Sequence, residues 1–138
     1  MRGTRIAQSS LDAVSEKGEV SVGPFEQTLP PTLARLGESH QTIDVAFVDG
    51  HHEEAATLHY VAAIEPYLSR PALMILDDIY LYEGMWRAWQ TLSSANDVVA
   101  INVGRFGLLV YDNDRAGGRR YDLSRYTGHW RVGRPRNC

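Results

Sequence analysis

The sequence lacks the features that mark secreted, membrane and nucleic-acid-binding proteins. Its single cysteine, Cys138, is the last of 138 residues, so the chain can form no internal disulfide, which fits a reducing, cytoplasmic setting. Residues 1–10 are polar and carry no export signal, and no apolar run approaches the roughly 20 residues that span a bilayer. A formal charge of -3 argues against general nucleic-acid binding. We therefore expect a soluble, cytoplasmic protein.

Helix or strand periodicity is also lacking at the C-terminal end. Residues 113–138 are rich in glycine and arginine. A basic segment of this kind can contact phosphate, but the acids interleaved with the arginines favour a solvated tail. We predict one α/β domain over residues 1–112 and a mobile tail over 113–138, with one docked aromatic among Tyr121, Tyr126 and Trp130.

A strand-helix-strand pattern occupies the middle of the chain. Two apolar runs of strand length, residues 43–48 and 72–76, flank residues 53–70, where apolar side chains recur at the three-to-four spacing of an amphipathic helix. Strands that are apolar throughout are typical of a parallel pair buried on both faces. Ligands bind beyond the carboxyl ends of such strands, so we expect the site at residues 49–52 and 77–78.

Weaker patterns cover the rest of the chain. We predict helices over residues 1–18, 25–36 and 83–95, the second interrupted by Pro30 and Pro31, and strands over 19–22, 98–103 and 107–111. The connection between the last two strands is too short for anything but an antiparallel hairpin. Together these elements predict an α/β fold with a mainly parallel sheet of about five strands, in which 19–22, 43–48 and 72–76 are parallel neighbours.

Three motifs follow one another along the chain: VGPF at residues 22–25, DVAFVDGHH at 44–52 and ILDDI at 75–79. In this order they resemble the C-terminal part of class I S-adenosylmethionine-dependent methyltransferases, close to the small-molecule O-methyltransferases of the catechol and caffeoyl-CoA type. The resemblance implies a partial Rossmann-like methyltransferase fold, S-adenosylmethionine as cofactor, and methyl transfer to a small-molecule acceptor through a hydroxyl. The glycine-rich cofactor loop of such domains is not in this sequence, so we expect the isolated chain to bind cofactor weakly and to be inactive.

Three carboxylates, those of Asp49, Asp77 and Asp78, are expected at the ends of neighbouring strands, where they repel one another unless a cation or hydrogen bonds compensate them. By resemblance to the metal-dependent O-methyltransferases, they would coordinate Mg²⁺, which holds the acceptor's hydroxyls and lowers the pKa of the one to be methylated. The alternative is that these acids cap the following helices or contact the cofactor. The sequence leaves both interpretations open.

The same resemblance assigns roles to the histidines and to an upstream turn. His52, three residues after Asp49, lies where the metal-dependent enzymes have a lysine that assists deprotonation of the acceptor, so these two are the candidate catalytic residues. The alternative is a helix-start histidine bonded to a neighbouring carboxylate. Cofactor contacts are expected from Gly23, Pro24, Phe25, Glu26, Asp49 and His51.

Aromatic residues follow the paired aspartates. Tyr80, Tyr82, Met85 and Trp86 could form a wall of the substrate site. Trp86 and Trp89, three residues apart on a predicted helix, are more typical of core packing.

Two functional classes are compatible with these observations. One is an enzyme that methylates a small molecule, with or without Mg²⁺. The other is a non-catalytic remnant or partial gene product that keeps the core of the fold but cannot bind cofactor alone. In either case a strand at 19–22, or its neighbour, would present an uncovered edge, and we expect self-association there.

Overall fold

The computed structural model describes residues 2–13, 18–113 and 118–127. The chain divides into two compact units, Met1–Ser39 and His40–Cys138. None of the described helices is both long enough and apolar enough to cross a membrane.

The first unit contains two helices, α1 (Arg2–Asp12) and α2 (Phe25–Glu38). Pro30 and Pro31 were expected to split or kink α2, and a split is wrong because both lie inside one continuous helix. Proline removes a backbone donor, but its fixed φ is itself helical, so the helix can continue past it. The helix also extends two residues beyond the predicted end at residue 36.

The predicted strand at residues 19–22 is absent from the described structure. A backbone donor of this segment bonds to a helix and not to a strand, because the N–H of Val20 donates to the side-chain oxygen of Gln8 on α1 at 2.9 Å. Glu19 pairs with Arg35 of α2 at 3.1 Å, and Val22 is 66% exposed. Apolar alternation over four residues is too short to specify a strand without a partner.

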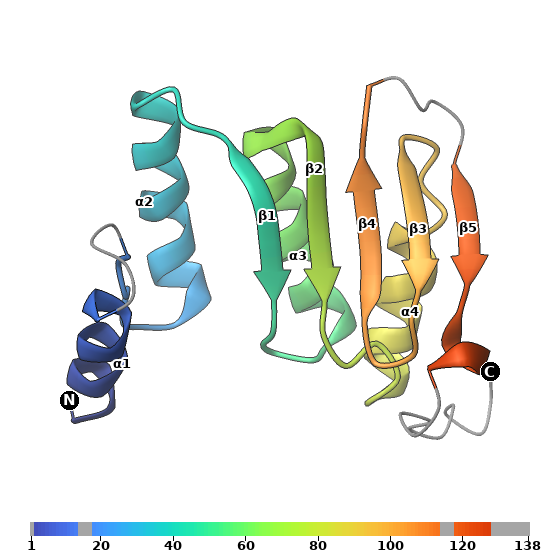
Figure 1. The fold of residues 1–138 in the computed structure, drawn as a ribbon, viewed down its shortest axis with the longest axis horizontal. Coiled ribbons are helices and arrows are strands. Elements are labelled where there is room, and N and C mark those ends of the chain that lie inside the picture. The colour runs from blue at the N-terminus through green and yellow to red at the C-terminus, as the bar shows by residue number, and fades with distance from the viewer. Residues whose placement is uncertain (1, 14–17, 114–117, 128–138) are drawn as a thin grey trace. The chain divides into compact units, whose positions relative to one another are not determined.

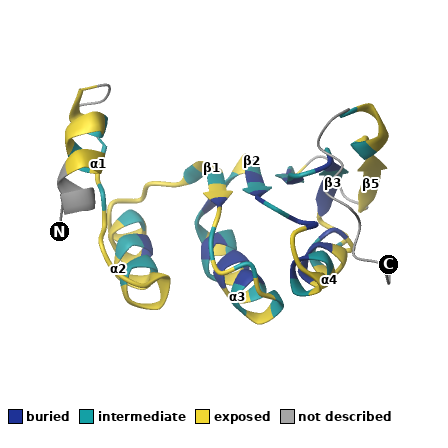
Figure 2. Ribbon diagram, turned by 90° about the horizontal axis from the view of Figure 1, so that it is seen from below, coloured by how far each residue is buried: buried dark blue, intermediate teal, exposed yellow. Residues whose placement is uncertain are grey.

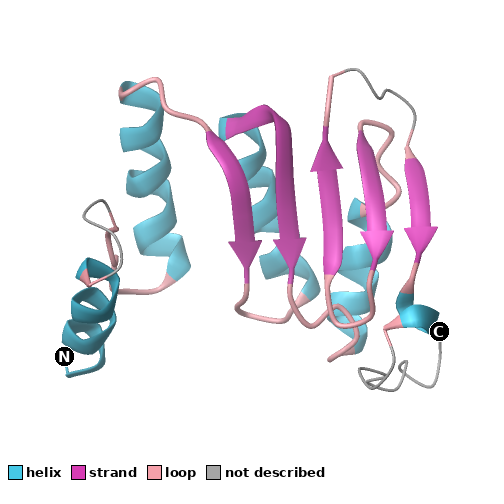
Figure 3. Cartoon of the chain, in the orientation of Figure 1, coloured by secondary structure: helices cyan, strands magenta, loops and turns pink. Residues whose placement is uncertain are grey.

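The second unit is built on a five-stranded sheet with the order β1-β2-β4-β3-β5 (Figures 1 and 3). Its elements are, in chain order, β1 (Ile43–Val48), α3 (Glu54–Ile64), a 3-10 turn η1 (Glu65–Tyr67), β2 (Leu68–Leu76), α4 (Glu83–Leu92), β3 (Val98–Asn102), β4 (Gly107–Tyr111), β5 (Arg119–Asp122) and a second 3-10 turn η2 (Ser124–Tyr126). The helix predicted over 53–70 ends early, because Pro66 follows it and Leu68 already belongs to β2.

Parallel and antiparallel pairs are mixed in this sheet. The predicted parallel pair β1–β2 and the predicted antiparallel hairpin β3–β4 are both confirmed. The strand β4 lies between β2 and β3 and is antiparallel to both. The α/β class and the number of strands are therefore as expected. The fifth strand, however, is β5, which pairs with β3 at one end of the sheet, and not the predicted strand at 19–22.

β5 corrects the prediction of a mobile tail over 113–138. Residues 119–122 pair in parallel with β3, and the N–H of Leu123 donates to the carbonyl of Asn102 at 2.7 Å. All four β5 residues are exposed, so backbone pairing rather than side-chain burial holds the strand, and no apolar pattern announces it. Neither Tyr121 nor Tyr126 is docked, with 47% and 69% exposure, and Trp130 lies outside the described residues.

The core of the second unit lies on one face of the sheet, the face that α3 and α4 cover (Figure 2). Met74, Leu76, Leu109 and Tyr111 point there and are 0% exposed. Alternate residues point to the opposite face, where Val45 and Phe47 of β1 are 59% and 56% exposed. The prediction that both apolar strands are buried on both faces is therefore wrong for β1, an edge strand on which Val45 and Phe47 are more than half exposed among the described residues.

Candidate functional site

Two loops meet at one edge of the sheet because β1 and β2 run parallel and end side by side. Val48 pairs with Leu76, and the N–H of Asp77 donates to the carbonyl of Val48 at 3.0 Å. The loop after β1 carries Asp49 and the two histidines, and the loop after β2 carries the paired aspartates. The topology thus brings together the acids that the sequence places at strand ends.

Asp49 and His52 form a pair across the first loop. The Nε2 atom of His52 lies 3.6 Å from Oδ1 of Asp49, and their side chains are 25% and 50% exposed. The distance exceeds that of a direct hydrogen bond, and it allows a direct ionic contact whenever the histidine is protonated. The predicted catalytic residues are therefore adjacent and accessible to solvent.

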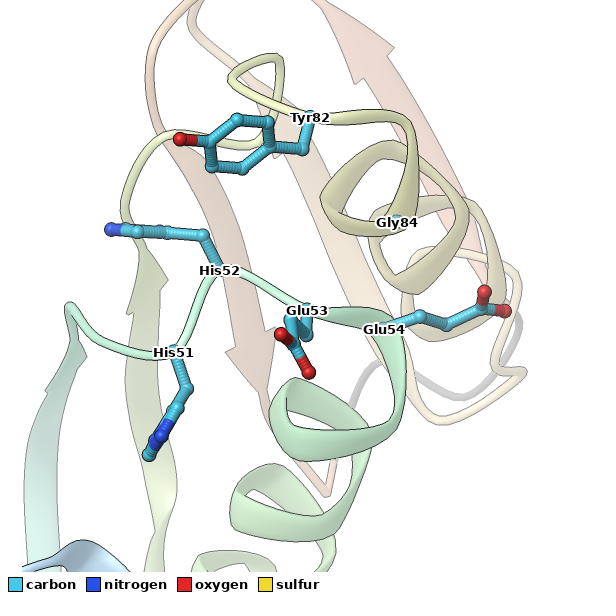
Figure 4. A pocket seen from close by; sticks show the side chains of 6 residues that line it. All are labelled: His51, His52, Glu53, Glu54, Tyr82 and Gly84. Carbon is cyan, nitrogen blue, oxygen red and sulfur yellow. The ribbon is translucent and has the colours of Figure 1, made fainter.

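His51 has a different environment from its neighbour. Its Nδ1 atom lies 2.8 Å from the hydroxyl of Tyr60 on α3, which is 2% exposed. Its backbone has a φ of 51°, in the left-handed region that costs free energy for residues with a Cβ atom. Figure 4 shows the two histidine side chains pointing in different directions from the loop. His51 is therefore exposed but bonded to the core residue Tyr60, whereas His52 is half-buried beside Asp49.

The paired aspartates after β2 contact an arginine. The Arg105 guanidinium binds Asp77 through two hydrogen bonds of 2.6 Å, Nε to Oδ1 and Nη2 to Oδ2, and Nε lies 2.9 Å from Oδ1 of Asp78. Asp77 is 2% exposed, so this is a nearly buried carboxylate with a bidentate partner. The hydrogen bond to Asp77 raises the pKa of Arg105 above its usual value, and the charges of Asp77, Asp78 and Asp49 raise it further. The three acids share one electrostatic environment.

The residues that were expected to hold Mg²⁺ do not fit that role as arranged. Both oxygens of Asp77 and one of Asp78 already face Arg105. In the parts of the chain that the structure describes, no three acidic, histidine or cysteine side chains are grouped to hold a metal ion.

A cavity of about 490 Å³ opens beside the first loop (Figure 4). It is lined by His51, His52, Glu53, Glu54, Tyr82 and Gly84. Gly84 of α4 permits a close approach to the start of α3, because a Cβ atom at position 84 would lie only 3.2 Å from the backbone nitrogen of Glu54. Arg87 of α4 fixes the same approach by binding Glu54 of α3 at 2.6 Å and Glu83 at 2.8 Å.

The expected aromatic wall is reduced to one residue. Tyr82 lines the cavity and is 59% exposed. Tyr80 and Met85 are buried at 5% and 3%, with Tyr80 stacked on Trp86 at 4.8 Å. Trp89 is 3% exposed, which confirms its predicted place in the core.

The expected cofactor residues fall in both units. Gly23 has a φ of 148° and precedes Pro24, the N-cap of α2, while Phe25 and Glu26 form its first turn. Phe25 is 42% exposed. Asp49 and His51 belong to the second unit. The first group forms a turn before a helix but does not follow a strand, as the sequence predicted it would, whereas the second group lies in a loop after β1 as expected.

Arg105 is the site residue that the sequence analysis missed. The Gly104-Arg105-Phe106 segment predicts only a tight turn between two strands. Its position becomes significant once β4 is known to lie next to β2, because the β3–β4 turn then reaches the edge that carries the acids. The sequence offers one signal for this contact: Arg105 is a single basic residue in the turn of a hairpin that follows the acidic pair Asp77 and Asp78.

Comparison with known proteins identifies the family. Residues 2–79, more than half of the chain, match the family model described as a methyltransferase domain. No curated protein and no solved structure matches the chain. The matched region contains the turn at Gly23, the loop with Asp49 and His52, and the paired aspartates. The chain therefore belongs to the methyltransferase domain family.

Proposed function

We propose that this domain transfers a methyl group from S-adenosylmethionine to a hydroxyl of a small-molecule acceptor. The observation that carries the proposal is the Asp49–His52 pair, 3.6 Å apart, beside an open cavity in a member of a methyltransferase family. Hydroxyl methylation needs a base for the hydroxyl proton, and histidine is the side chain best suited to that task near neutral pH.

His52 acts as the general base in this proposal. It accepts the acceptor's hydroxyl proton, and the Asp49 carboxylate stabilises the imidazolium that results. Bound S-adenosylmethionine supplies an electrophilic methyl group on a sulfonium sulfur. Tyr82, across the cavity from His52 in Figure 4, offers an exposed ring against which a flat acceptor can pack.

Each unit by itself carries residues suited to contact the cofactor. Phe25 and Glu26, at the start of α2, supply a ring and a carboxylate for the adenine, and the Gly23 turn admits close backbone approach. Asp49 and His51 supply polar groups at the sheet edge. The Tyr60 hydroxyl fixes the His51 ring, so that its orientation is set before any ligand arrives.

The test is methyl transfer from labelled S-adenosylmethionine, at millimolar concentration, to a panel of phenols and vicinal diols. Replacing a general base lowers the rate by roughly 10²–10⁴-fold, and we expect that loss for His52→Ala. His59→Ala is the matched control, because His59 is an exposed histidine on α3 that does not line the cavity. Transfer that survives His52→Ala would contradict the role of His52. A folded wild-type chain that shows no transfer and binds no S-adenosylmethionine even at millimolar concentration would favour the alternative, a non-catalytic remnant.

A further inference from the structure

The carboxylate of Asp77 is almost completely buried, and a single side chain satisfies both of its oxygens. The two bonds from Arg105 are parallel and 2.6 Å long. A guanidinium matches a carboxylate in this fork geometry, which an ammonium or a water molecule cannot reproduce. Asp77 is thus fixed in orientation.

The same guanidinium also reaches the neighbouring acid. Its Nε atom lies 2.9 Å from Oδ1 of Asp78. Asp78 has a φ of 52°, and the hydrogen bond from its own N–H to Oδ1 of Asp77, 2.7 Å long, ties the two aspartates together. One positive charge therefore holds a strained backbone position and two like charges in place.

A divalent cation at this edge would need the same oxygen atoms. Mg²⁺ takes six oxygen ligands at about 2.0–2.1 Å in a nearly regular octahedron. To reach both aspartates it would have to displace Arg105, and a displaced guanidinium would leave its two strongest hydrogen bonds. Arg105 and a metal ion are therefore competing occupants of one position.

We infer that Arg105 is the resident cation of this site and takes the place of a divalent metal ion at the Asp77–Asp78 pair. It is a positioning residue, since it acts through the two aspartates and holds the loop that follows β2 against the β3–β4 turn. The inference rests on these contacts alone and does not depend on the proposed methyl transfer.

Mn²⁺ binding to the full chain tests the inference, measured by calorimetry and by electron paramagnetic resonance. We expect no saturable binding to the wild type at millimolar Mn²⁺. Arg105→Gln frees the aspartates and should bind Mn²⁺ at least about tenfold more tightly than the wild type. The double variant Arg105→Gln/Asp77→Asn should lose that gain. Arg105→Lys keeps the charge without the fork and should bind less Mn²⁺ than Arg105→Gln.

The inference is overturned if the wild type binds one Mn²⁺ per chain and Asp77→Asn abolishes that binding, or if folded Arg105→Gln gains nothing. Circular dichroism and amide NMR spectra establish whether the variants fold. Should Arg105→Gln not fold, the wild type still decides the question through the carboxyl ¹³C shifts of its aspartates during a Mg²⁺ titration. Shifts of Asp77 and Asp78 that stay constant support the inference, and shifts that saturate with Mg²⁺ refute it.

Discussion

The hydroxyl of Tyr60 lies 2.8 Å from Nδ1 of His51, and this contact anchors the loop after β1 to the helix that follows it. Tyr60 is 2% exposed, whereas His51 is exposed, so the bond joins a core residue to the rim of the cavity. The loop is therefore held at two points, by β1, which precedes it, and by the hydrogen bond to Tyr60 of α3.

Removing the anchor with Tyr60→Phe should lower the free energy of unfolding by about 0.5–1.5 kcal/mol, the net contribution of a typical hydrogen bond. The ring stays in the core, so packing is retained. Urea denaturation measures the loss, and the ring ¹H–¹⁵N spectrum of His51 should show increased motion. An unchanged His51 spectrum would mean that Tyr60 does not fix the ring.

Alkaline pH should destabilise the second unit through Tyr111. Burial raises the pKa of Tyr111, and its hydrogen bond to Glu65, 2.7 Å long, raises it further. An unfolded tyrosine loses its proton near pH 10, whereas the folded one keeps it. The stabilisation is therefore complete below about pH 10 and is lost as the pH rises above that value, by up to about 1.4 kcal/mol per pH unit.

Urea denaturation at a series of pH values between neutral and strongly alkaline checks this dependence. Tyr111→Phe should flatten the fall in stability. Tyr126→Phe is the matched control, since Tyr126 is 69% exposed, and it should behave like the wild type. Equal pH dependence in all three proteins would rule out Tyr111 as the cause.

The exposed apolar side chains of β1 should make the chain self-associate. Val45 and Phe47 are more than half exposed on an edge strand. The ring centroids of Phe47 and Phe106 lie 6.3 Å apart, so the apolar surface extends onto the β3–β4 turn. Exposed apolar edge strands promote pairing between chains. Phe47→Lys should shift sedimentation velocity profiles toward monomer, while Leu123→Lys, at another exposed apolar position, should not. A wild-type chain that stays monomeric over a wide concentration range would contradict this prediction.

Sequence patterns predicted the parts of the fold that depend on local apolar order. The bounds of β1 follow from its apolar run, and the β3–β4 hairpin follows from two apolar runs with a short connection, although β3 ends at Asn102, one residue before the predicted end. Asp49 and His52 were proposed as catalytic residues from the family resemblance, and they meet because they lie three residues apart in one loop. β5 escaped prediction because its Arg-Arg-Tyr-Asp sequence buries nothing and is held by backbone pairing alone. Arg105 escaped because its contact with Asp77 depends on β4 lying next to β2, which is a matter of strand order.

His51 and Asp78, one in each loop of the site, both hold a left-handed backbone conformation. Glycine adopts it readily and asparagine, aspartate and histidine adopt it more often than other residues, whereas a β-branched residue would be strongly disfavoured. Evolutionary change at these two positions is therefore restricted by conformation before chemistry is considered. A chain could exchange Asp78 for asparagine or glycine and keep the loop, whereas valine or isoleucine there would redirect the loop and move the acids beside it.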